Sequence, residues 1–169
     1  MKWFKMAFVL FFLVIGVRAQ QGFKIGLHGG IPIQGEVNEV VSLVAGADLG
    51  YLFALGEVVD AGIMTGFVNG FPEKFDSGGA DLPHVQFLPL AASFRIWPSN
   101  SFSFGADAGY ALGLNPGNDG GVYYRPVIGY LMGPRTEVNL SYTGIDTPGQ
   151  PWATVTLGVL YTFTKNLRR

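Results

Sequence analysis

The sequence predicts an all-β protein, an eight-stranded antiparallel up-and-down β-barrel that crosses a membrane. The first sign is alternation: from Trp152 to Phe163 every odd position is apolar, and the even positions are mostly Thr and Gly. The second is composition, because charged residues make up 14% of the chain, against about 25% in soluble domains. The third is that no apolar run beyond residue 20 approaches a membrane helix in length. A closed sheet is then the remaining way to span lipid.

Residues 1–19 form a predicted signal peptide. Lys2 and Lys5 supply a basic start, an apolar run extends from Met6 to Val17, and small residues flank Arg18 at the expected cleavage point after Ala19. The run is shorter than the ~20 residues of a membrane helix, which argues against a retained anchor. Residues 20–169 are therefore expected to form one barrel domain.

Charge and cysteine content exclude two kinds of chemistry. The chain has no Cys, so neither disulfides nor thiolates contribute to the fold or to a reaction. Without Lys2, Lys5 and Arg18 the 11 basic residues fall to 8 against 12 acidic ones, a formal charge of −4. A negative mature chain argues against nucleic acid as a partner.

Eight segments alternate like strands and are separated by turn signals. Most have about the 9–11 residues, or slightly more, that a tilted membrane strand needs. They are Gly22 to Ile31, Val41 to Ala54, Glu57 to Asn69, Val85 to Trp97, Ser101 to Leu114, Val122 to Met132, Thr136 to Ile145 and Trp152 to Phe163.

The connections between these segments alternate in length. Short turns are expected at 55–56, 98–100 and 133–135, and longer segments rich in Gly, Pro, Asp and Asn at 32–40, 70–84, 115–121 and 146–151. Short periplasmic turns and longer external loops are typical of outer-membrane barrels. With an even number of strands, both termini are predicted to lie in the periplasm.

The oilier face of each strand is predicted to face lipid, and every charged residue within a strand then falls on the opposite face. The outward set is Phe23, Ile25, Leu27, Leu43, Leu49, Tyr51, Phe53, Val59, Ile63, Phe67, Leu88, Leu90, Phe94, Ile96, Phe102, Phe104, Tyr110, Leu112, Val122, Tyr124, Ile128, Tyr130, Val138, Leu140 and Tyr142. The inward charges are Lys24, Asp48, Asp60, Arg95, Asp107, Arg125 and Glu137.

An eight-stranded barrel has an interior just wide enough for side chains, so these charges are expected to pair in a packed polar lumen. For Arg95 the first expected partner is Asp107 and the second is Asp60. A narrow passive pore for small solutes is the alternative function. A soluble lipocalin-like binding barrel is an alternative fold, in which the same strands would turn inside out.

Aromatic residues are expected near both barrel ends, where they would form two interfacial girdles. One group lies toward the predicted periplasmic side and the other toward the outside. The first contains Tyr51, Phe53, Phe94, Phe102, Phe104, Tyr161 and Phe163, and the second Phe67, Tyr110, Tyr124, Tyr142 and Trp152.

Several of these features together resemble the eight-stranded OmpA/OmpX-like outer-membrane barrels, also called porin family proteins, in versions seen in Bacteroidetes-type bacteria. They are the signal peptide, the Gly-x-Asp-x-Gly segments at 46–50 and 105–109, the segment Leu90 to Trp97 leading through a turn to Ser103 to Tyr110, and the ending Tyr161-Thr-Phe163. The resemblance implies a Gram-negative outer-membrane location and an assembly signal in Tyr161 and Phe163 for the barrel-assembly machinery. The tail from Thr164 to Arg169 departs from the usual terminal Phe.

An enzymatic role is the weaker hypothesis. A barrel lipid hydrolase needs a His with a Ser and an acid in reach, and only His28 with Ser42 on the neighbouring strand offers that contact. No catalytic residue or cofactor is predicted. No metal site is predicted either, because the segment from Asn115 to Gly121 has oxygen donors without the spacing of a calcium loop.

The predicted external loops are acidic. The residues are Glu36, Glu39, Glu73, Asp76, Asp81, Asp119 and Asp146, with Lys74 the one opposing charge. Such loops are expected either to bridge lipopolysaccharide phosphates through divalent ions or to bind a basic surface partner. The expected role is therefore structural or adhesive, in contact with outer-membrane lipid.

Overall fold

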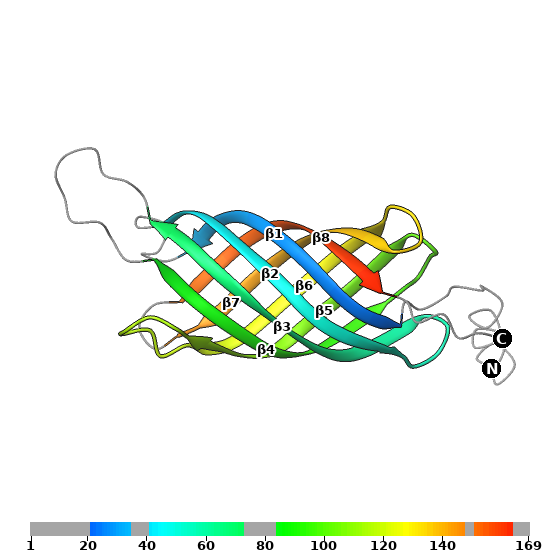
Figure 1. The fold of residues 1–169 in the computed structure, drawn as a ribbon, viewed down its shortest axis with the longest axis horizontal. Coiled ribbons are helices and arrows are strands. Elements are labelled where there is room, and N and C mark those ends of the chain that lie inside the picture. The colour runs from blue at the N-terminus through cyan, green and yellow to red at the C-terminus, as the bar shows by residue number, and fades with distance from the viewer. Residues whose placement is uncertain (1–20, 35–40, 73–83, 148–150, 164–169) are drawn as a thin grey trace, which may run out of the picture.

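The computed structural model describes residues 21–34, 41–72, 84–147 and 151–163. These residues form one closed antiparallel barrel in which each strand pairs with its neighbours in chain order and β8 closes onto β1 (Figure 1). The strands are β1 (Gly22–Gln34), β2 (Val41–Ala54), β3 (Val59–Pro72), β4 (Val85–Ile96), β5 (Phe102–Gly113), β6 (Gly121–Leu131), β7 (Thr136–Asp146) and β8 (Trp152–Phe163). The predicted fold class is confirmed.

Strand existence and order follow the prediction, and the bounds differ by at most three residues. β1 continues three residues past Ile31 to Gln34 by pairing with β8 alone, and β3 begins two residues later and ends three residues later than predicted. The described residues contain no helix long and apolar enough to cross a membrane. The predicted signal peptide, residues 1–19, lies outside the described part of the chain.

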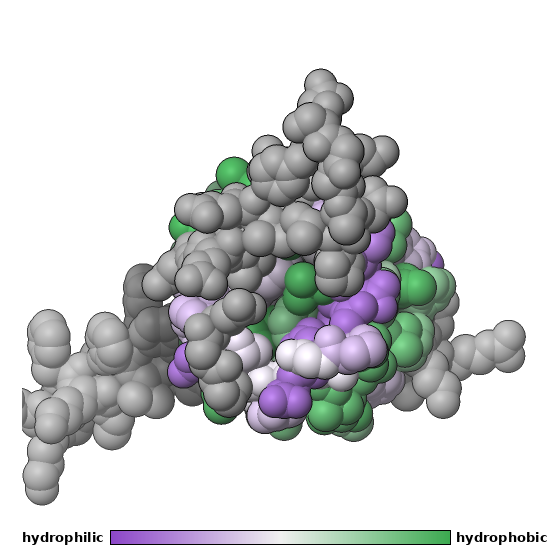
Figure 2. All heavy atoms as spheres, turned by 90° about the vertical axis from the view of Figure 1, so that its left-hand side faces the viewer, coloured by the Kyte–Doolittle hydropathy of each residue, from purple (hydrophilic) through white to green (hydrophobic). Residues whose placement is uncertain are grey.

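The two ends of the barrel differ in their connections (Figure 1). At one end β1 begins, β8 ends and the connections β2–β3, β4–β5 and β6–β7 are short; we call it the turn end. At the other end lie the β1–β2, β3–β4, β5–β6 and β7–β8 connections, and we call it the loop end. Figure 2 views the loop end, where hydrophilic residues near the centre lie beside hydrophobic residues of the wall.

The wall is apolar outside and polar inside. None of the 25 side chains predicted to face lipid is buried, and most are more than 36% exposed. All seven predicted inward charges are buried, none more than 8% exposed. A soluble binding barrel would have the reverse arrangement.

Two prolines interrupt the ladder without shifting its register. Pairing of β3 with β4 stops at Thr65↔Leu90 and resumes at Val68↔Phe87, across from Pro89. A similar gap surrounds Pro126 between β6 and β7. Proline has no N–H to donate, and at the first gap the Thr65 hydroxyl donates to the Pro89 carbonyl at 2.8 Å.

Candidate functional site

The centre of the lumen is an ion-pair network around Arg125. From β6, Arg125 donates to Asp107 of the adjacent β5, with Nη2 to Oδ2 at 2.8 Å, and reaches across the barrel to Asp48 of β2, with Nη1 to Oδ2 at 2.9 Å. All three side chains are at most 10% exposed. The network therefore ties opposite walls together through the interior.

Two further residues extend this network. Arg95 of β4 donates to Asp107 at 2.8 Å and to the Ser93 hydroxyl at 3.2 Å. The His28 ring contacts Asp48, with Nδ1 to Oδ2 at 3.1 Å. The result is a continuous chain from β1 to β4, in the order His28, Asp48, Arg125, Asp107 and Arg95. A charged network is stable at this depth only because each acid meets more than one donor.

The two Gly-x-Asp-x-Gly segments hold the acids of this network. Asp48 and Asp107 are their central residues, and the first glycine of each lies under a long side chain from the neighbouring strand. A methyl group at Gly46 would overlap the His28 ring, and one at Gly105 would overlap the Arg95 side chain and the Phe94 carbonyl. The glycines thus give the neighbouring side chain room to reach the acid.

A second polar group lies closer to the turn end. Lys24 donates to the Thr162 hydroxyl at 2.9 Å, and the Trp97 indole N–H donates to Asp60 at 2.8 Å. Glu137 and Ser103 meet over Gly129, where an added methyl group would overlap both. Trp97, 1% exposed, is buried at this end of the barrel.

The loop end of the lumen is apolar, although a polar lumen is predicted from the inward charges. A cluster of buried hydrophobic residues lies there. In it the Phe87 and Trp152 rings pack edge to face, with their centroids 5.4 Å apart. Its members are Val41, Val44, Val68, Phe87, Ala91, Ala111, Tyr123, Ile145 and Trp152. We call this cluster the apolar plug. Val44, Val68 and Phe87 occupy the inward alternation of their strands, and that run of inward hydrophobics was the available signal.

Trp152 was assigned to the outer girdle, and that prediction is wrong. Its side chain is 2% exposed and lies inside the plug. Position 152 has the inward parity of β8, whose outward residues are Leu157, Val159 and Phe163. Ala153 is also buried, and it pairs with Gln34 beside the register shift of β1 between Pro32 and Gln34.

Aromatic residues do gather outside near both ends. At the turn end the ring centroids of Phe23 and Phe163 are 6.1 Å apart, and those of Phe102 and Tyr130 are 5.0 Å apart. Nearer the loop end Tyr124 stacks on Tyr142 at 6.1 Å. Tyr161 and Phe163, the predicted assembly signal, pack edge to face at 4.8 Å. The tail from Thr164 to Arg169 lies outside the described residues.

The hypothesised contact between His28 and Ser42 is wrong. His28 lies opposite Gly46 of β2, four positions from Ser42 along the strand. The pairing of β2 with β3 shifts between Val41 and Leu43, and this irregularity leaves Ser42 exposed outside. His28 instead faces Asp48, without a nucleophile among its described contacts.

Of the seven acidic loop residues, the structure describes Asp119 and Asp146, both exposed at the loop end. Glu36, Glu39, Glu73, Asp76 and Asp81 lie outside the described residues. His84, at the edge of β4, contacts the Asn69 amide at 3.1 Å and the Phe71 ring. Within the described ranges no group of three His, Cys, Asp or Glu side chains could hold a metal ion.

A closed barrel of eight strands, apolar outside and charged inside, defines the class of protein: the fold is that of the eight-stranded outer-membrane β-barrels. Two solved structures of the Yersinia pestis attachment invasion locus protein Ail share it. The structure in a phospholipid nanodisc has 14% identity, a TM-score of 0.60 and coverage of 85% of this chain and 99% of Ail. The crystal structure has 14% identity, a TM-score of 0.59 and coverage of 86% and 100%.

A de novo designed transmembrane β-barrel is similar as well, with 12% identity, a TM-score of 0.54 and coverage of 87% of this chain and 99% of the design. The sequence matches no protein-family model and no curated protein. At these identities the similarity establishes the fold, and the role has to be argued from this chain's own residues.

Proposed function

We propose that this protein is a non-enzymatic integral outer-membrane barrel with a closed lumen and a structural or surface-interaction role. The observation that carries the proposal is the division of the wall into a lipid-compatible exterior and a buried ion network. Charged side chains facing lipid at mid-depth would cost about 2–4 kcal/mol each. All seven strand charges listed above are instead paired or packed inside.

Three closures in series support a sealed lumen over a passive pore. Trp97 is buried and bonded to Asp60 at the turn end, the Arg125 network crosses the middle, and the apolar plug is packed at the loop end. The space bounded by Asp48, Met64, Tyr123 and Arg125 is too small for a water molecule. An ion crossing this interior would have to displace both bonded charges and packed aromatic rings.

The proposed location has the signal peptide removed after Ala19, the turn end in the periplasm and the loop end outside. Assembly through the Tyr161–Phe163 ending follows from the resemblance to OmpA/OmpX-like barrels. Outside, the acidic loops would meet divalent ions on lipopolysaccharide phosphates or a basic surface partner. Ail is named the attachment invasion locus protein, and a surface-interaction role here is proposed by analogy with that name.

Membrane fractionation tests the location. The protein should appear in the outer-membrane fraction and migrate differently in unheated and boiled gel samples, because a closed barrel resists detergent until heated. A soluble periplasmic band with identical migration in both samples would contradict the proposal.

Conductance in a planar lipid bilayer tests the closed lumen. The refolded protein should give no stable current steps, whereas a reproducible solute-sized step would favour the passive pore. The fractionation result keeps the two questions separate, since a conducting barrel would still be heat-modifiable.

A further inference from the structure

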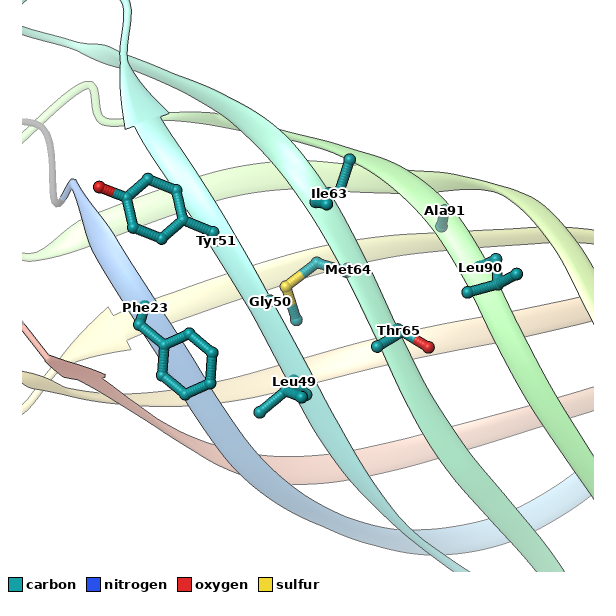
Figure 3. A pocket seen from close by; sticks show the side chains of 9 residues that line it. All are labelled: Phe23, Leu49, Gly50, Tyr51, Ile63, Met64, Thr65, Leu90 and Ala91. Carbon is teal, nitrogen blue, oxygen red and sulfur yellow. The ribbon is translucent and has the colours of Figure 1, made fainter.

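The outer wall of β1 to β4 contains a groove of about 530 Å³ (Figure 3). It lies on the face that the proposed function assigns to the bilayer. Nine residues line it: Phe23, Leu49, Gly50, Tyr51, Ile63, Met64, Thr65, Leu90 and Ala91. None of them is an Asp, Glu, Lys, Arg or His.

The floor of the groove is made by small or inward-facing residues. Ile63 and Leu90 rise at the rim, 69% and 51% exposed, while Met64 and Ala91 point inward and are buried. Gly50 has the inward alternation of β2, so it presents only backbone to the groove, and the Met64 thioether occupies the space on its inner side (Figure 3). A flexible thioether adapts its shape to an apolar neighbour.

The groove offers almost no hydrogen-bonding group to a ligand. The Thr65 hydroxyl already donates to the Pro89 carbonyl at 2.8 Å. The Tyr51 hydroxyl points away from the groove toward the end where β1 begins, which is the turn end (Figure 3). This arrangement suits an uncharged hydrocarbon in the groove with a polar group beyond Tyr51.

From this geometry we infer that the groove holds one acyl chain of a phospholipid from the leaflet at the turn end. The inference rests on the proposed membrane location. The groove volume lies within the ~300–1,000 Å³ of small-ligand sites, and its lining matches a chain without charge or hydrogen-bonding groups. A chain held there makes dispersion contacts on several sides, whereas a chain against flat wall makes them on one.

A second copy of this protein fits the groove less well. Stable protein interfaces use about 20–30 residues on each side, and the groove offers nine. In lipid, apolar surface alone does not drive proteins together. The bilayer supplies acyl chains at every point of this wall.

Tryptophan quenching by phospholipids brominated in the middle of the acyl chain tests the inference. Ile63→Trp places a reporter at the rim, and Ile128→Trp is the matched control on β6, also exposed and near the turn-end half of its strand. The native Trp97 and Trp152 are buried in the lumen and add a common background. Both variants are reconstituted in full-length mature form, with a minority of brominated lipid.

Quenching of Ile63→Trp should exceed that of Ile128→Trp by about threefold, because the groove surrounds the chain. Adding Thr65→Leu, which fills the groove, should remove the excess. Leu90→Trp on the opposite rim should repeat the excess and serves as the reporter if Ile63→Trp fails to fold.

Equal quenching at both positions would overturn the inference and leave the membrane location intact. No quenching at either position would contradict the membrane location itself. An unquenched Ile63→Trp that forms cross-linked dimers, beside a quenched Ile128→Trp, would assign the groove to a second copy and also overturn the inference.

Discussion

At the scale of single residues, Arg125 is the most heavily connected charge of the lumen. It holds two carboxylates on different walls, Asp48 and Asp107. Arg95 is attached to one of the same acids. Removing Arg95 therefore leaves Asp107 paired with Arg125, whereas removing Arg125 takes an ion-pair partner from both Asp48 and Asp107.

Arg125→Ala should destabilise the barrel by about 3–5 kcal/mol, the usual cost of breaking a buried ion pair. Arg95→Ala should cost less, because Asp107 retains Arg125. Urea unfolding in detergent micelles, followed by tryptophan fluorescence, measures both. Arg135→Ala at an exposed turn is the control and should change stability by no more than about 0.5 kcal/mol.

If Arg135→Ala lowered the free energy of unfolding as much as Arg125→Ala, the network would not be what stabilises the fold. Neutralising Asp107 in the Arg95→Ala background should restore little, since that change also removes a partner of Arg125. A simple Arg95–Asp107 pair would be partly rescued by that change, but Asp107 is shared with Arg125.

His28→Ala and Ser42→Ala test the hydrolase hypothesis directly. His28→Ala should lower stability, because Asp48 loses one of its contacts, while the exposed Ser42→Ala should leave it unchanged. Neither should alter lipid A or phospholipid composition of the host membrane, measured by mass spectrometry. Disappearance of a deacylated lipid in either variant would revive an enzymatic role.

At the scale of strands, small residues on one strand provide the space that long side chains of the next strand occupy. Gly105 of β5 accommodates Arg95 of β4, and Gly46 of β2 accommodates His28 of β1. This pairing of glycine with a long neighbour explains why the inward faces are rich in Gly while the lumen is nevertheless full.

Gly105→Ala should destabilise the barrel by about 1–3 kcal/mol, the typical cost of overpacking. The added methyl group meets the Phe94 carbonyl as well as the Arg95 side chain, so the backbone has to move. Gly29→Ala is the matched control, because its methyl group would make only an ordinary contact at 3.6 Å with the Val44 carbonyl. Urea midpoints of the two variants should differ clearly; equal midpoints would contradict this account.

At the scale of the whole molecule, the two ends of the barrel are chemically distinct. The turn end combines short turns with a polar interior, and the loop end combines longer connections with the apolar plug. Under the proposed location, the plug lies on the external side and keeps the charged lumen from solutes outside.

Cysteine labelling tests this orientation, because the chain contains no native Cys. Asp119→Cys, exposed at the loop end, should react with a membrane-impermeant maleimide on intact cells. Asn100→Cys, exposed at the turn end, should react only after the outer membrane is permeabilised. The opposite result would reverse the proposed topology.

The sequence by itself determined the eight strands, their order, the lipid-facing side chains and the inward position of all seven strand charges. These properties depend on a local period of two and on turn residues between strands, which are visible in a single chain. The sequence also predicted Asp107 as the first partner of Arg95, because their strands are adjacent and a short turn sets the register between them.

Only the tertiary structure decided the contacts across the lumen, the apolar plug, the inward position of Trp152 and the separation of His28 from Ser42. Arg125 and Asp48 are 77 positions apart, and barrel closure brings them together through strand tilt and stagger. The register shift near Val41 turns Ser42 to the outer face, and the alternation of apolar and polar residues in the sequence does not indicate this shift. Closure and register are properties of all eight strands at once, so no single segment encodes them.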